Sequence, residues 1–362
     1  MRHARTILAC LFLATSLAAA CVSGTQTSTG GGKKKKGPNE PVVIGFSMDT
    51  LKEERWQRDK ELVEKRVREL GATLYLQVAN GSDSDQIKQS ENMLTQGIDV
   101  LIVAPHNGEI AASIVEAAHR QGVPVISYDR LIRNADVDLY VSHQVVKIGE
   151  MQASYLLSHI TSQQKPFNFV IVGGSPTDNN ALLLHQGQMN ILQPAITRGD
   201  VKIVKDDYAK EWQASNALNI VENALTQSNN QVDAVVCSND GTARGAIQAL
   251  EGQNLAGKVL VSGQDADLAS LQLIVQGKQT MTVYKPIAPL ADSAVDSAIK
   301  MARGEKVDTK DTIDNGRKAV PSILQEPIAV DKNNIVSTIV KDGYQTLEKI
   351  CAGIPPDKCP KQ

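Results

Sequence analysis

The chain has 362 residues, a formal net charge of −2, and 42% hydrophobic against 22% charged residues. This composition excludes a largely disordered protein, and the length predicts two domains that are each large enough for a core of their own. The nearly balanced charge also argues against a nucleic-acid-binding protein, because the chain has no basic excess to attract phosphates.

The first residues predict an export signal rather than part of the fold. A basic start precedes the apolar run 7–20, which is too short for a comfortable membrane span, and Cys21 follows Leu-Ala-Ala-Ala. The segment 1–21 resembles a bacterial lipoprotein signal, in which a lipid on Cys21 would anchor the mature protein outside the cytoplasm. The alternative is an ordinary signal peptide cleaved near Ala20. Residues 22–40 are polar and lysine-rich and are predicted to form a flexible linker.

From residue 41 onward, short apolar runs alternate with segments of helical periodicity. Thr50 and Glu53 have the spacing of a capping box at the start of the first helix. The first half of this region predicts strands at 42–48, 73–79, 98–104, 123–128 and 138–142, and helices at 53–70, 84–96 and 108–121.

The second half repeats this plan. It predicts strands at 167–172, 201–204, 232–238, 258–263, 280–284 and 326–330, and helices at 146–160, 180–193, 213–227, 242–252, 266–275, 286–303 and 333–349. Regular alternation of strand and helix predicts an α/β protein with doubly wound parallel sheets. The last strand and helix have no sheet of their own, so they are expected to dock on lobes already formed.

Two stretches of the chain occur nearly twice, at almost the same spacing. IDVLIVAPHN at 98–107 is similar to VDAVVCSND at 232–240, and GVPVISYDR at 122–130 is similar to GKVLVSGQD at 257–265. Each is an apolar, strand-like run that ends in a polar residue. Ligands of open α/β sheets bind outside the carboxyl ends of the strands. The repeat therefore predicts two similar lobes that present polar strand ends to one ligand between them.

The residues at these strand ends and helix starts are carboxylates, amides, guanidinium groups and tryptophans. Carboxylates and amides can bond the neighbouring hydroxyls of a sugar, and tryptophan can stack on its C–H face. Simpler explanations exist for each position. Asp265 and Asn239 could cap the helices that follow, Asp129 with Arg130 could be a surface ion pair, and Asp178 could belong to a plain turn. Trp56 and Trp212 could be ordinary packing residues, and Lys285 a solvated loop lysine.

The cysteines and histidines indicate no metal site and no cofactor. Cys237 lies in an apolar run and is expected to be a buried thiol, whereas Cys351 and Cys359 could form a local disulfide outside the cytoplasm. No spacing fits a zinc site, and the chain has no phosphate-binding loop, dinucleotide fingerprint or nucleophile elbow. These absences argue against an enzyme.

Several stretches together carry a resemblance to a known family: LKEERWQRDK at 51–60, QVANGSDSDQIKQSENMLTQGIDVLIVAPHNG at 77–108, YDRLI at 128–132, GGSPTDNNA at 173–181, SNDGTARGAIQAL at 238–250, SGQDADLA at 262–269 and QTMTVYKPI at 279–287. With them the chain resembles the periplasmic sugar-binding proteins of the ribose and pentose type, and among these the branch that binds D-xylose.

The resemblance implies the type I periplasmic binding protein fold, with two doubly wound parallel-sheet lobes joined by a three-strand hinge. The expected division is an N-terminal lobe of 41–143 plus 286–327, a C-terminal lobe of 144–285 plus 328–349, and a tail at 350–362. The implied partners are a monosaccharide and an ABC transporter permease. A sensory module that reports sugar to a membrane kinase or chemoreceptor is the alternative.

The same resemblance implies the site residues by their positions in this chain: Arg55, Trp56, Asp129, Arg130, Asp178, Asn180, Trp212, Asn239, Asp265 and Lys285. Two stretches depart from the family pattern. SHQVV at 142–146 lies at the expected first crossing between the lobes, and AKEWQ at 209–213 stands where the family has a Gly-Trp pair.

Overall fold

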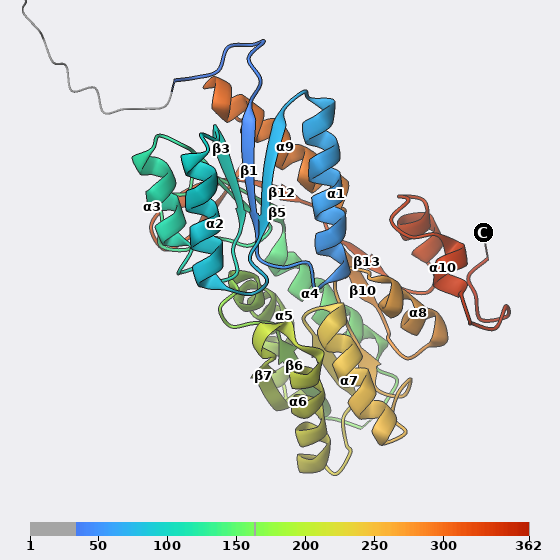
Figure 1. Cartoon of the computed structure of the whole chain (residues 1–362). Coiled ribbons are helices and arrows are strands. Elements are labelled where there is room, and N and C mark those ends of the chain that lie inside the picture. Colours follow the sequence, from blue (N-terminus) through green and yellow to red (C-terminus); the bar gives the residue numbers. More distant parts are fainter. Residues whose placement is uncertain (1–33, 163, 362) are drawn as a thin grey trace, which may run out of the picture.

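The computed structural model describes residues 34–162 and 164–361, and within them the chain forms two α/β lobes placed end to end (Figure 1). The chain crosses between the lobes after β5, after β10, and between β12 and β13. This architecture confirms the predicted fold class. The signal segment and the lipidation of Cys21 concern residues outside the described part of the chain.

The first lobe is built on a seven-stranded sheet of order β11-β12-β5-β4-β3-β1-β2, parallel except for β11. Its elements are β1 (Val43–Met48), α1 (Glu54–Glu69), β2 (Thr73–Val78), α2 (Asp83–Thr95), β3 (Val100–Ala104), α3 (Ala112–Arg120), β4 (Val125–Tyr128), β5 (Leu139–His143), α9 (Ile287–Arg303), β11 (Asp311–Asp314) and β12 (Ala319–Gln325).

Helices cover both faces of this sheet, which explains the continuous apolar runs of its strands. In β3, Ile102 packs in a cluster with α1 and α9, whereas Leu101 and Val103 pack in a cluster with α2 and α3 on the other face. A strand buried on both faces has no polar side, so its residues are apolar throughout.

The second lobe has a four-stranded parallel sheet of order β7-β6-β8-β9, and β10 pairs with β13 beside it. Its elements are α4 (Val145–His159), β6 (Phe167–Gly173), α5 (Asn179–Thr197), β7 (Val201–Tyr208), η1 (Lys210–Trp212), α6 (Ala214–Gln227), β8 (Ala234–Cys237), α7 (Asp240–Gly252), β9 (Leu260–Val261), α8 (Leu268–Gln276), β10 (Thr282–Tyr284), β13 (Ile328–Val330), η2 (Val336–Val340) and α10 (Leu347–Cys351).

The sequence repeat corresponds to a repeat of topology. The order β2-β1-β3-β4 of the first sheet recurs as β7-β6-β8-β9 in the second, so the repeated stretches form equivalent strands. Even the hydrogen bonds recur: Asp99 accepts from the backbone N–H of Val43 at 2.8 Å, and Asp233 accepts from that of Asn168 at 2.7 Å. Each aspartate ties the start of its strand to the neighbouring first strand of the lobe.

Two features near the amino end differ from expectation. The predicted capping box is wrong: the hydroxyl of Thr50 accepts from the N–H of Lys52, and α1 begins after Glu53 without a side-chain cap. The described end of the predicted linker is also not free, because the N–H of Lys36 donates to Ala302 at the end of α9.

Larger differences lie in the last 60 or so residues. The strands β11 and β12 were not predicted from the sequence, because β11 is rich in charged residues and β12 contains Pro321, which pairs only with the edge strand β11. The single helix predicted at 333–349 is wrong. Gly343 has a φ of 68°, a left-handed conformation that stops the turn η2, and Thr346 caps the short helix α10.

Part of the tail predicted at 350–362 packs on the second lobe. Ile350 and Ile354 are buried in a cluster with α8, and a disulfide joins Cys351 to Cys359, as the cysteine spacing allowed. Cys237 is a buried free thiol, also as expected.

His143, one of the departures from the family pattern, lies at the hinge. It ends β5, and its Nε2 donates to the carbonyl of Pro286 at 3.1 Å, so it joins the first crossing to the second. The ring is 1% exposed, and burial, reinforced by the nearby charge of Lys285, lowers the pKa of His143 to about 3. The hinge therefore holds this histidine in its neutral form.

Because His143 is neutral in the folded protein, we expect the unfolding free energy to fall in acid. Because the unfolded chain takes up a proton near pH 6.5 and the folded one does not, His143 lowers the unfolding free energy by up to about 1.4 kcal/mol per pH unit as the pH falls below about 6.5. We expect His143→Gln to flatten the pH dependence of urea unfolding between pH 7 and 4.5. The exposed His159 provides the control His159→Gln, and an unchanged slope in His143→Gln would contradict the assignment.

Candidate functional site

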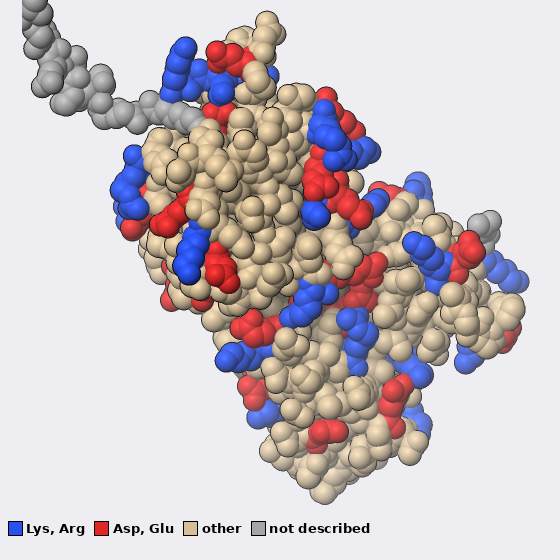
Figure 2. All heavy atoms as spheres, viewed as in Figure 1, with Lys and Arg blue, Asp and Glu red and all other residues tan. Residues whose placement is uncertain are grey.

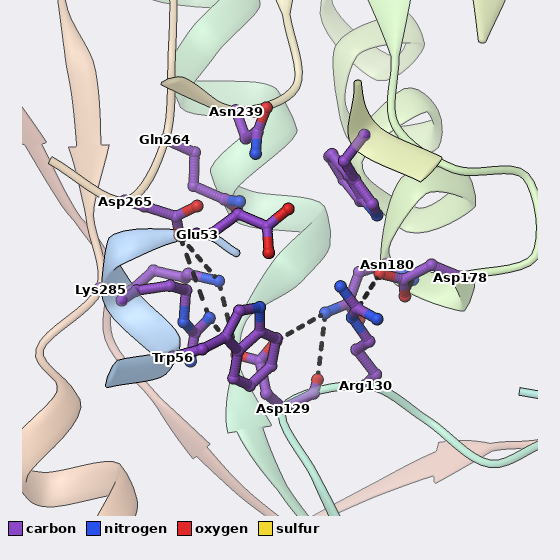
Figure 3. Close-up of a pocket in the computed structure, with 12 residues that line it drawn as sticks. Glu53, Trp56, Asp129, Arg130, Asp178, Asn180, Asn239, Gln264, Asp265 and Lys285 are labelled. Atoms are coloured by element: carbon purple, nitrogen blue, oxygen red, sulfur yellow. Dashed lines mark hydrogen bonds and ion pairs between the residues drawn. The ribbon is translucent and has the colours of Figure 1, made fainter. Parts of the chain in front are cut away.

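All of the predicted sugar-site residues line one cavity between the lobes (Figure 3). They come from equivalent places in both lobes: Asp129 and Arg130 follow β4, Asp265 follows β9, and Asn239 follows β8. The remaining ones belong to the first turns of α1 and α5, to η1, and to the crossing after β10.

Charges of opposite sign alternate on one side of the cavity. The Oδ2 atom of Asp129 lies 2.7 Å from Arg55 Nη1 and 3.4 Å from Lys285 Nζ, and Lys285 lies 3.2 Å from Asp265 Oδ1. These side chains are at most 10% exposed. Burial alone would raise the pKa of Asp129, but the attraction of Arg55 and Lys285 outweighs it and holds this pKa well below its usual range. Asp129 is therefore ionised.

Arg55 is held on the side away from the cavity by Asp59, a residue not predicted from the sequence. Asp59 is fully buried, and both of its oxygens accept from Arg55, at 3.0 and 3.1 Å, while the hydroxyl of Tyr128 donates to it as well. The two residues stand four apart on α1, a spacing that places them on one face of a helix. This fork-like pairing sets the direction in which Arg55 points.

Arg130 links the lobes beneath the cavity. Its Nε lies 2.8 Å from Asp178 of the second lobe, and its Nη1 lies 2.6 Å from Asp49, which follows β1. Burial would lower the pKa of Arg130, but Asp178 and Asp49 raise it well above its usual value. The guanidinium carbons of Arg130 and Arg55 lie 5.1 and 4.3 Å from the ring centre of Trp56.

The two tryptophans come from different lobes, Trp56 from α1 and Trp212 from η1. Both are at least nine-tenths buried and both line the cavity. Gly174 makes room for the second ring, because a Cβ at this position would lie 2.1 Å from Trp212. The cavity thus has an apolar wall from each lobe and charged groups between them.

The alternatives raised for single residues are partly correct. Asn239 does cap α7, since its side chain accepts from the N–H of Thr242 at 2.8 Å, and Asp178 caps α5 by accepting from Asn180 at 2.9 Å. Both nevertheless line the cavity. Asp265 is not a cap, because Asp267 caps α8.

Glu53 and Gln264 also line the cavity, although neither was predicted as a site residue from the sequence. Each stands directly beside a predicted site segment, and this adjacency was the available signal. Figure 3 shows the carboxylate of Glu53 projecting between Gln264 and Trp56.

Buried polar atoms at the cavity retain unused bonding capacity. Glu53 Oε2, Trp212 Nε1 and Asp265 Oδ1 have no hydrogen-bond partner among the described residues, although Asp265 has its ion pair. Backbone strain gathers here too, with φ values of 58° at Asp129, 55° at Trp212 and 99° at Asp265. Strained backbone and unpaired buried groups are typical of binding sites, where a ligand supplies the missing partners.

Two doubly wound lobes with a polar cavity between their strand ends define a ligand-capturing binding protein of the hinged type. A family model described as "Periplasmic binding protein domain" matches residues 44–306, and the chain belongs to this family.

Among curated relatives, the D-xylose-binding periplasmic protein of Haemophilus influenzae is 50% identical over 86% of this chain and 93% of its own length. That of Escherichia coli is 47% identical over 84% and 91%. Among solved structures, a carbohydrate transporter solute binding protein from Chloroflexus aurantiacus, in complex with D-glucose, has a TM-score of 0.80 at 30% identity, covering 86% of this chain and 98% of that one.

The Arg55–Asp59 pair yields a stability prediction. Asp59→Ala leaves a buried guanidinium with one fewer partner, so we expect it to lower the unfolding free energy by about 3–5 kcal/mol. Its control is Glu61→Ala on the same helix, which removes the exposed pair with Arg58 and should cost at most about 1 kcal/mol. Chemical denaturation measures both, and equal losses in the two variants would refute the special role of Asp59.

Proposed function

We propose that this protein captures a monosaccharide, D-xylose, between its two lobes outside the cytoplasm and delivers it to an ABC transporter permease. The observation that carries the proposal is the cavity itself, where fixed carboxylates, cations and amides alternate between two tryptophans. The two D-xylose-binding relatives, each about half identical to this chain, support the choice of sugar.

The chemistry of the cavity suits a sugar because each sugar hydroxyl both donates and accepts. Asp129 and Asp265 can accept from hydroxyls, Arg55 and Lys285 can donate to them, and Asn239 can do so through its amide nitrogen. Hydrogen bonds to charged groups contribute about 1.5–3 kcal/mol each.

Lobe closure would bury the sugar and form the bonds between the lobes together. Besides Arg130 with Asp178, Glu54 of the first lobe accepts from the N–H of Leu268 at the start of α8, at 2.9 Å. A ligand that contacts both lobes favours the closed form, which is the form that a permease would recognise.

The relatives' periplasmic location supports an extracytoplasmic site of action. A lipid on Cys21 would tether the lobes to a membrane, whereas cleavage near Ala20 would release them. In the described residues no helix is long and apolar enough to cross a membrane. Mass spectrometry of the mature protein distinguishes lipidation of Cys21 from cleavage near Ala20, since lipidation adds acyl chains to Cys21.

A sensory role is the second candidate. It is favoured by a relative named multiple sugar-binding periplasmic receptor from Rhizobium radiobacter, which is 34% identical over 85% of this chain and 92% of its own length. Both roles use the same closed form, and co-purification with a permease or with a receptor kinase distinguishes them.

Calorimetric titration with D-xylose tests the ligand, with D-glucose, L-arabinose and D-ribose as comparators. We expect one-to-one binding of D-xylose, weakened about 10- to 150-fold in Asp265→Ala because a charged hydrogen bond is lost. Asp311→Ala, an exposed change on β11, serves as the control.

Absence of heat with all four sugars would refute the monosaccharide assignment. Preference for another of the four would correct the sugar and leave the clamp intact. Conversion of the sugar by the purified protein would contradict a purely binding function.

A further inference from the structure

A second set of contacts between the lobes lies at the mouth of the cavity and involves none of the predicted sugar contacts directly. It centres on Glu211, the residue before Trp212 in η1 of the second lobe. Two first-lobe residues reach it: Lys52 Nζ donates to its carbonyl oxygen at 2.6 Å, and His106 Nε2 lies 3.0 Å from its carboxylate. Both basic and acidic side chains gather along this seam (Figure 2).

The backbone of Glu211 is held in an unfavourable conformation. Its φ of 55° and ψ of 23° are left-handed, and Trp212 follows with a φ of 55°. For a residue with a side chain this conformation is disfavoured, and glycine adopts it freely. A glutamate that tolerates such strain while forming contacts to the other lobe, next to a cavity-lining ring, indicates a role in closure.

His106 connects the seam to a further carboxylate. Its Nδ1 lies 2.8 Å from Asp83 at the start of α2, and its side chain is 13% exposed. A neutral imidazole carries one N–H and can donate to only one of the two carboxylates, whereas an imidazolium can donate to both. The bridge from Asp83 through His106 to Glu211 is therefore complete only when the ring is protonated.

We propose that Glu211 is a positioning residue that clasps the lobes together through His106 and Lys52, holds Trp212 against the ligand and slows ligand release. We call these three residues the clasp. The inference rests on the proposed function, because it concerns how the lobes stay closed over the sugar that they capture.

The charges around the ring favour its protonated form. Burial opposes protonation of His106, but the hydrogen bonds to Glu211 and Asp83 and the charge of Asp49 outweigh it, so the pKa of His106 lies above its usual value. The groove outside the cavity also contains Lys52, Lys210 and Arg130, whose positive charges act in the opposite direction.

The pH dependence of closure follows from this balance. Opening the lobes separates His106 from Glu211, so the ring binds its proton more tightly in the closed form than in the open form. The clasp is then fully formed below the ordinary histidine pKa of about 6.5, and it weakens as the pH rises through the higher pKa of the closed form. Ligand release should accelerate over that range.

Stopped-flow tryptophan fluorescence measures the release of the sugar that the wild type binds, at pH 6 and pH 8. We expect the wild type to release it about three- to fivefold faster at pH 8. This factor corresponds to the free energy that a partly exposed charged pair contributes. In Glu211→Gln and His106→Gln, release should be fast at both pH values. The control is His185→Gln, because His185 pairs with Asp206 at 2.9 Å within the second lobe only. It should retain the wild-type ratio.

The variant Glu211→Gly distinguishes the proposed role of Glu211 in the clasp from a purely structural role of this residue. Glycine relieves the left-handed backbone and retains the carbonyl that Lys52 contacts, so this variant should melt no lower than the wild type and yet release sugar faster. Slower or unchanged release in Glu211→Gly, or a wild-type pH ratio in His106→Gln, would overturn the proposal.

A ligand-independent measurement distinguishes failure of the clasp from failure of the proposed function. If the wild type binds none of the tested sugars, the proposed function fails, and the clasp is judged by NMR titration of the His106 ring in protein whose lobes are held closed by an engineered cross-link. A midpoint above the ordinary value that falls in Glu211→Gln supports the contact between the lobes. A midpoint that is the same in both proteins refutes it.

Discussion

The alternation of Arg55, Asp129, Lys285 and Asp265 beside the cavity is the interaction on which the rest of the structure depends. Each of these charges would cost several kcal/mol to bury alone, and only opposite charges at close range offset that cost. The set is shared between parts of the chain far apart in sequence: Arg55 and Asp129 belong to the first lobe, Asp265 belongs to the second, and Lys285 lies at a crossing between them. The closed arrangement of the lobes is therefore coupled to the burial of these charges.

The duplicated topology explains why such a set forms at all. In each lobe the parallel strands end at the same edge, and the three crossings place the two edges opposite each other. Loops at these ends are free to carry polar residues because the apolar strands and the helices on both faces supply the stability. The left-handed backbone at Asp129 and Asp265 shows that the strand ends are shaped for the cavity at some local cost.

Contacts between the lobes flank the cavity at distinct places. Glu54 joins α1 to the start of α8, Arg130 pairs with Asp178 beneath the cavity, and Glu211 meets His106 and Lys52 at its mouth. In the first two, a carboxylate accepts from a backbone N–H or pairs with a guanidinium. The third includes an imidazole, the side chain that changes charge near neutral pH. Closure therefore combines contacts at three places, one of which contains a histidine that responds to pH.

The sequence by itself determined the α/β class, the two-lobed repeat, and the strand ends at which Asp129, Asn239 and Asp265 stand. Such features follow from apolar periodicity and from the order of elements along the chain, which are local properties.

Only the tertiary structure decided the rest. Asp59 behind Arg55, Glu53 inside the cavity, and the bridge from His106 to Glu211 are contacts in which burial and neighbouring charge matter more than local pattern. β12 likewise became a strand because β5 offered a partner edge, although Pro321 disfavours a strand locally. Contacts between segments far apart in the chain produce no periodic pattern in the sequence. They can therefore be seen only in the folded structure.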